Sequence, residues 1–77
     1  MSIQEVCGSV IKKIRTQKGM TQEELAWKCD VDKVFIYRIE SGINQPTITT
    51  LFKISEGLGI DCSFLIKEVE KDLPNRE

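Results

Sequence analysis

Four side chains in the stretch 33–38 have the chemistry to recognise another molecule. They are Lys33, Val34, Tyr37 and Arg38. At about 100° per residue a helix places these four on one contiguous arc, and Phe35, Ile36 and Ile39 fall on the opposite arc. The inward three can anchor the helix in a core by themselves. The outward four therefore put two cations, an aromatic ring and an aliphatic group on a face that packing does not need.

Such a face suits the major groove of DNA, which is wide enough to admit one helix. Arginine and lysine can donate to guanine O6 and N7, and an aliphatic group can touch a thymine methyl. A solvated amphipathic helix with incidental apolar residues on its surface would give the same pattern. The helical wheel alone supports the two interpretations equally.

No catalytic or metal-binding constellation accompanies this face. The chain has no histidine, and its three cysteines, Cys7, Cys29 and Cys62, are odd in number and far apart. No CxxC pair, zinc-type cluster or glycine-rich phosphate loop can be drawn. We therefore expect no enzyme activity, no metal and no cofactor. The cysteines are expected to be small, buried and reduced, with a redox switch as the alternative.

Length and charge are those of a small binding domain. The 77 residues, 40% of them hydrophobic, make one domain with a marginal core. Residues 11–53 carry eight Lys and Arg against five Asp and Glu, whereas residues 54–77 carry three against six. The net charge of −1 thus hides a basic front and an acidic tail. No apolar run could span a membrane and no signal peptide opens the chain, so we expect a cytoplasmic protein.

Apolar periodicity and capping signals predict five helices, and no strand pattern competes with them. The first is expected from about Ile3 to Lys18. N-cap residues mark the starts of the other four, namely Thr21, Asp32, Thr47 and Asp61. We expect an all-α fold of five short helices in a single domain over 1–77, with the core in 3–72 and a frayed tail at 73–77. The buried stripes include Ile3 in the first helix and Ile48, Leu51, Ile54 and Leu58 in the fourth.

The junction of the second and third helices matches a known pattern. Only a few residues separate them, so they must cross steeply, as in a helix-turn-helix. The stretch LAWKCDVDKVFIYRIESG, preceded by GMTQEE and followed by PTITTLFKISEGLGID, closely resembles the Cro/CI-type (Xre family) helix-turn-helix domain. The resemblance covers about 11–65. The short, free-standing form looks most like phage-type repressors and the controller proteins of restriction–modification systems.

The resemblance implies a compact, lambda-repressor-like domain that binds double-stranded DNA and regulates transcription. It assigns Gln22 to a DNA phosphate and neighbouring side chains, and Asn44 and Gln45 to a loop that touches the DNA backbone. It assigns base edges and flanking phosphates to the four outward residues, Lys33, Val34, Tyr37 and Arg38.

The resemblance also implies a pair, Arg15 and Glu40, that links the first helix to the third. An exposed ion pair worth at most about 1 kcal/mol is the alternative interpretation.

The sequence also departs from the family pattern. Asp30 replaces the turn glycine, and we expect the turn to persist with some strain because aspartate tolerates the left-handed conformation. Val34, Phe35 and Tyr37 replace frequent small polar residues, so the family's target sequence does not carry over. Phe35 is expected in the core or at its rim, with a base contact as the alternative. Trp27 is expected to pack partly against the first helix, with a DNA contact as the alternative.

One recognition helix reads only a few base pairs, so we expect a homodimer on a pseudo-palindromic operator with half-sites about 34 Å apart. The fifth helix offers Ile66 and Val69, with Phe64, as its interface, although these residues could instead close the monomer's own core.

Two further alternatives remain open. Glu23 and Glu24 could contact RNA polymerase, or they could simply favour the start of the second helix. The whole domain could also be a protein-interaction module, such as an antitoxin or adaptor, that keeps the fold without reading DNA. Lys33 and Arg38 beside the outward face favour the DNA interpretation.

Overall fold

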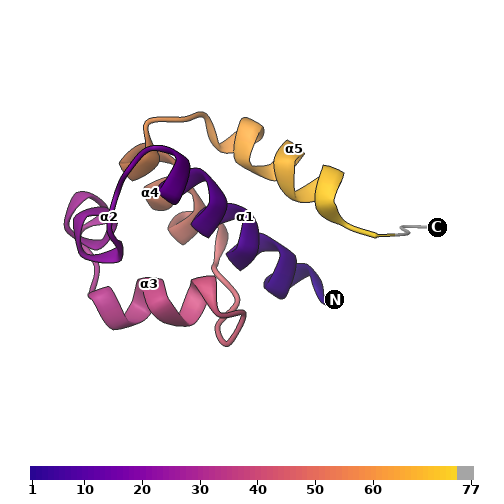
Figure 1. Cartoon of the computed structure of the whole chain (residues 1–77), viewed down its shortest axis with the longest axis horizontal. Coiled ribbons are helices and arrows are strands. Elements are labelled where there is room, and N and C mark those ends of the chain that lie inside the picture. Colours follow the sequence, from indigo (N-terminus) through magenta and orange to yellow (C-terminus); the bar gives the residue numbers. More distant parts are fainter. Residues whose placement is uncertain (75–77) are drawn as a thin grey trace.

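The computed structural model describes residues 1–74 and confirms the all-α expectation, since every regular element in that range is a helix. The elements are α1 (Ile3–Gln17), α2 (Gln22–Cys29), α3 (Lys33–Glu40), α4 (Ile48–Leu58) and α5 (Cys62–Asp72). α1 packs against α3 and α5, and α2 packs against α3 and α4 (Figure 1). Within residues 1–74, no helix is both long and apolar enough to cross a membrane.

Side chains cap most of these helices as the sequence predicts. The hydroxyls of Thr21 and Thr47 and the carboxylate of Asp32 each accept a backbone N–H from the first turn of their helix. Thr21 shares a capping box with Glu24, and the N–H of Thr21 donates to that carboxylate, which lowers the pKa of Glu24. Asp61 stands at the N-cap of α5, but its side chain makes no capping hydrogen bond.

The core is built from apolar residues of all five helices. Its largest fully buried apolar side chains are Val10, Ile11, Leu25, Ile36, Ile39, Ile54, Leu58 and Leu65. The expectation that Ile3 and Ile48 are buried is wrong, since Ile3 is 63% exposed and Ile48 is 69% exposed. Both lie in the first turn of their helices, where the apolar stripe continues past the end of the core.

The structure differs from the predicted frayed tail, 73–77, at the first residue of that tail, Leu73. Leu73 packs against the core, and its N–H donates to the carbonyls of Val69 and Glu70 at 3.1 and 3.3 Å. A half-buried apolar side chain therefore holds this residue in place. The last part of the predicted tail, 75–77, lies outside the described residues.

The three cysteines are free, as expected. Cys7 and Cys29 are buried, and desolvation raises the pKa of both thiols. A raised pKa keeps a thiol protonated and unreactive. Cys62 differs from the expectation because it is only half-buried.

The turn between α2 and α3 confirms the expectation for Asp30. This residue has φ 58° and ψ 45°, in the left-handed region, and is the only non-glycine residue with positive φ among residues 1–74. The next residue, Val31, donates its N–H to the carbonyl of Ala26 at 3.0 Å. The turn is kept, with the strain that a Cβ brings to this conformation.

Replacement of Asp30 should change stability in opposite directions for glycine and alanine. Asp30→Gly removes the Cβ and should raise the free energy of unfolding by about 0.5–1 kcal/mol, whereas Asp30→Ala should lower it. Urea unfolding followed by circular dichroism measures both. A glycine variant less stable than the alanine variant would contradict the backbone assignment.

Candidate nucleic-acid interface

The outer face of α3 is the most distinctive surface of the protein. Val34 is 56% exposed and Tyr37 is 52% exposed, and the side chains of Lys33 and Arg38 are also exposed. The side chains of these two cations make no hydrogen bond or ion pair within residues 1–74. The face is therefore free to bind, with the orientation that the helical wheel predicts.

The opposite face of α3 fixes this orientation. Ile36 and Ile39 are fully buried, and Phe35 packs against the core from its rim, as expected. The carboxylate of Asp32 accepts the N–H of Val34 at 3.0 Å and starts the helix. α3 thus cannot rotate about its axis without exposing its core residues.

A buried ion pair joins α1 to the end of α3. Arg15 Nε donates to Glu40 Oε2 at 2.6 Å and Arg15 Nη2 donates to Oε1 at 3.0 Å. Arg15 Nη1 also donates to the carbonyl of Met20 at 2.6 Å. The two residues are only 7% and 8% exposed, so the alternative of an exposed ion pair is wrong.

The same network reaches the first residue of α2. Gln22 Nε2 donates to Glu40 Oε1 at 3.0 Å, and its side chain is half-buried. One N–H of the amide is thereby committed to a neighbouring side chain. The carboxylate of Glu40 ties α1, α2 and α3 together at a single point.

A hollow of about 520 Å³ lies at this junction. Its lining residues are Arg15, Met20, Thr21, Gln22, Glu23 and Lys33. The start of α2 therefore shares one surface with Lys33, which belongs to the outer face of α3. Backbone N–H groups at the start of a helix, next to a cation, suit an anionic group.

The loop after α3 is fastened to the same helix. The N–H groups of Ile43 and Asn44 donate to the carbonyl of Arg38 at 2.9 and 3.2 Å. Asn44 is half-buried and Gln45 is exposed. All seven residues assigned to DNA thus lie on α3 or on segments bonded to its ends.

The predicted dimer residues do not form one exposed patch. Val69 is only 6% exposed and belongs to the monomer's core, so its assignment to an exposed interface is wrong. It faces α1 because α5 packs against that helix. Ile66 and Phe64 are 41% and 47% exposed. Phe64, unlike Ile66, lines a hollow beside Lys13 and Gln17 of α1.

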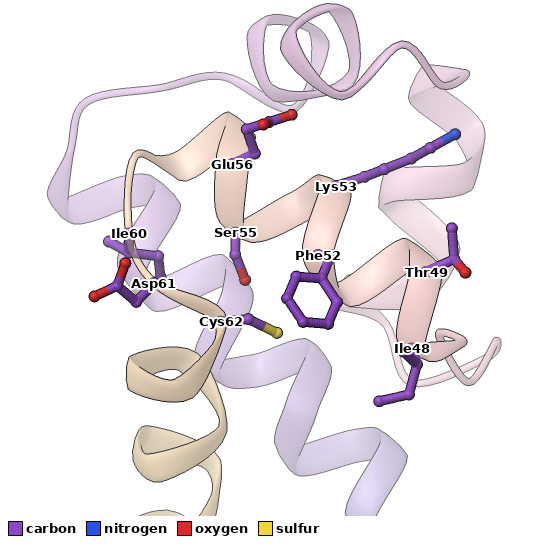
Figure 2. Close-up of a pocket in the computed structure, with 9 residues that line it drawn as sticks. All are labelled: Ile48, Thr49, Phe52, Lys53, Ser55, Glu56, Ile60, Asp61 and Cys62. Atoms are coloured by element: carbon purple, nitrogen blue, oxygen red, sulfur yellow. The ribbon is translucent and has the colours of Figure 1, made fainter.

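Sequence reasoning missed a second apolar surface, between α4 and the start of α5. Ile48 and Phe52, which is 60% exposed, line a hollow of about 550 Å³ together with Ile60 and Cys62 (Figure 2). Phe52 directly follows a core residue, Leu51, and the two side chains point to different sides of α4, of which the Leu51 side is covered. Trp27 was also misplaced, since it is 82% exposed rather than packed against α1.

The fold and the outer face of α3 define a helix-turn-helix protein, in which the second helix of the motif presents an exposed face beside the hollow at the start of α2. Residues 11–65 match the helix-turn-helix family, and the chain belongs to it. It is a member of a class of DNA-binding regulators.

Similar proteins span nearly the same length. Control protein C.MunI of a Mycoplasma species is 38% identical over 66 residues, covering 84% of this chain and 89% of that protein. Control protein C.BamHI of Bacillus amyloliquefaciens is 35% identical over 66 residues, covering 84% and 82%. The crystal structure of the wild-type restriction–modification controller protein C.Esp1396I superposes with a TM-score of 0.89 at 34% identity, covering 100% of this chain and 99% of that one.

Removal of one partner from the buried pair should be far more damaging than removal of an exposed one. Arg15→Met leaves the Glu40 carboxylate buried without its counter-ion and should cost about 3–5 kcal/mol, enough to unfold much of so small a domain. The double variant Arg15→Met/Glu40→Leu should recover part of this loss. Thermal unfolding measures each variant.

The exposed pair Lys13–Asp72, with atoms 3.1 Å apart, is the matched control. Lys13→Ala should change stability by less than about 1 kcal/mol. Equal losses for Arg15→Met and Lys13→Ala would contradict a special role for the buried pair.

Proposed function

We propose that this protein is a sequence-specific regulator of transcription that binds double-stranded DNA as a homodimer on a pseudo-palindromic operator, and that it is a restriction–modification controller. The single observation that carries the proposal is the free outer face of α3, with Lys33, Val34, Tyr37 and Arg38 exposed together. Binding, and not catalysis, is the activity assigned, and the cytoplasm is the compartment in which such a regulator would work.

Roles within the face follow from the chemistry of each group. Arg38 and Lys33 can donate to guanine O6 and N7 in the major groove, and Val34 can contact a thymine methyl. Tyr37 offers a hydroxyl and a ring to a base edge or a phosphate. These four groups would read sequence.

Positioning falls to the groups at the two ends of α3. Gln22 keeps one amide N–H free of Glu40 and stands at the hollow beside Lys33, where a phosphate would fit. Asn44 and Gln45 would touch the backbone of the same duplex farther along. Such contacts fix register and carry no sequence information by themselves.

The controller assignment is supported by similarity over most of the chain. Both curated relatives carry the name control protein, and the C.Esp1396I structure carries the name restriction–modification controller.

Affinity for DNA should depend steeply on salt and on the face of α3. If six or more phosphates are neutralised, affinity should fall about 10³-fold between 50 and 200 mM salt. Arg38→Ala should cost roughly 1–3 kcal/mol and relax preference at particular base pairs, while Gln22→Ala should weaken all sequences alike.

Fluorescence titration of a duplex taken from upstream of the protein's own gene measures both effects. An Arg38→Ala variant with unchanged affinity and sequence preference contradicts the assignment of the outer face of α3, and a flat salt response rejects the DNA proposal. The interaction-module alternative would then stand.

The homodimer is proposed because one helix reads too few base pairs to select a site in a genome. We place its interface at the surface missed by the sequence, around Phe52 and Ile48. Cys62 lines the same hollow, and Ile66 follows Cys62 by four residues and so shares its side of α5. Phe64, on the α1 side of α5, would lie outside this interface.

Phe52→Asp should convert the dimer to a monomer, because it would bury an unpaired charge in the interface. Sedimentation at micromolar concentration measures this, and alkylation of Cys62 should be faster in the variant than in the dimer. Trp27→Asp, at an exposed aromatic ring that does not line this hollow, is the control. If Phe52→Asp stays dimeric, the interface does not lie at this surface. If the parent protein is a monomer on DNA, the homodimer proposal is wrong.

RNA polymerase is a further proposed partner, through Glu23. The carboxylate of Glu24 is committed to capping α2, whereas the exposed Glu23 lies one turn from the exposed Trp27 on the same side of the helix. Glu23→Ala should not weaken DNA binding, because it removes a negative charge from the hollow beside Lys33, and it should reduce activated transcription in vitro. Unchanged transcription would remove polymerase from the proposal.

A further inference from the structure

One glycine lies where α1 meets the end of the recognition helix. Gly8 is buried in the middle of α1, and an added Cβ there would overlap the carbonyl oxygen of Ile39 and lie 2.9 Å from that of Glu40. Real Cβ atoms essentially never approach closer than 3.0 Å. The two helices therefore touch backbone to backbone at this point.

Helix propensity does not explain this glycine. Gly8 has ordinary helical conformation, where alanine would favour the helix and glycine weakens it. A glycine kept inside a helix at such a cost indicates a packing reason. The contact with α3 is that reason.

Two other contacts lie on the same side of α1. Gln4 Nε2 donates to the carbonyl of Gly42, just beyond α3, at 2.7 Å, and Arg15 pairs with Glu40 as described above. Gln4, Gly8 and Arg15 are spaced by four and seven residues, which places them on one face of a helix. Three residues on one face of α1 thus contact the last turn of α3 and the residues just beyond it.

We propose that Gly8 is a positioning residue for DNA recognition, because the close approach it permits sets where the C-terminal half of α3 stands in the groove. This inference rests on the proposed function. The atoms that a Cβ would meet are backbone atoms of α3, which cannot turn aside as a side chain would. The last turn of α3 must therefore move away from α1, by on the order of 1 Å, a displacement that spoils a preorganised binding site.

The displacement would reach the residues that read and position DNA. Arg38 lies one residue before Ile39, and its carbonyl accepts the N–H groups of Ile43 and Asn44. A shift of the last turn of α3 therefore carries Arg38 and the following loop with it. Lys33, at the far end of α3 and away from the Gly8 contact, should move less.

The test compares specific with non-specific binding for the full chain. A duplex selected by the parent protein from a random pool is the specific probe, and a scrambled duplex of equal length is the non-specific one. Gly8→Ala should lower specific affinity at least about 10-fold and non-specific affinity by less than about 3-fold, so the specificity ratio falls. All titrations are made where circular dichroism shows the variant folded.

Gly59→Ala is the matched control. Gly59 has φ 73° and no atom within 4 Å of an added Cβ, so alanine there strains the backbone without displacing a neighbour. It should lower stability and leave the specificity ratio unchanged. If Gly8→Ala does not fold, Gln4→Ala, which removes the bond to Gly42 without a collision, should lower the ratio about 3-fold.

Each outcome decides a different point. A folded Gly8→Ala protein, or in its place Gln4→Ala, that keeps the specificity ratio of the parent overturns the positioning role. A ratio that falls equally in Gly59→Ala assigns the effect to stability and also overturns it. A parent protein that selects no duplex from the pool overturns the proposed function itself.

Discussion

The buried pair between Arg15 and Glu40 is the interaction on which the rest of the structure depends. Removing two charges from water is costly, and the attraction between them repays this only when the remaining hydrogen-bonding groups are satisfied. Here the carbonyl of Met20 and the amide of Gln22 complete the set. The pair consequently joins α1, α2 and α3, with the turn before α2 bonded through Arg15, and a shift of the start of α2 or the end of α3 would break a bond to it.

This arrangement gives the two faces of α3 different roles: the inner face fixes the helix in the domain, and the outer face is available to contact DNA. The inner face contributes Ile36 and Ile39 to the core and the last turn is held by α1, so the helix is fixed in rotation and in depth. The cationic side chains of the outer face, Lys33 and Arg38, make no hydrogen bond or ion pair with any residue in the range 1–74. A rigid helix with a free polar face loses little conformational freedom on binding, because its backbone is already in place. The net charge is −1, and the acidic residues of the stretch 54–74 lie on α4, on α5 or between them rather than on α3.

Local signals in the sequence were enough to predict the five helices, their caps at Thr21, Asp32 and Thr47, and the outward face of α3. Contacts between segments far apart in the chain were not readable in the same way. Periodicity placed Ile48 inside because it cannot show where the core ends, and Val69 was offered to a partner because α1 was not known to cover it. Likewise, nothing local distinguishes a buried Arg15 from an exposed one, since its burial depends on a carboxylate 25 residues away.

Methylation interference on the selected duplex tests the central claim most directly, because it reports which groove α3 enters. If the outer face of α3 reads base edges in the major groove, methylation of guanine N7 should block binding in two half-sites about one helical turn apart, and methylation of adenine N3 in the minor groove should have little effect. Interference confined to the minor groove, or none at all on a duplex that the protein binds specifically, would contradict a recognition role for α3.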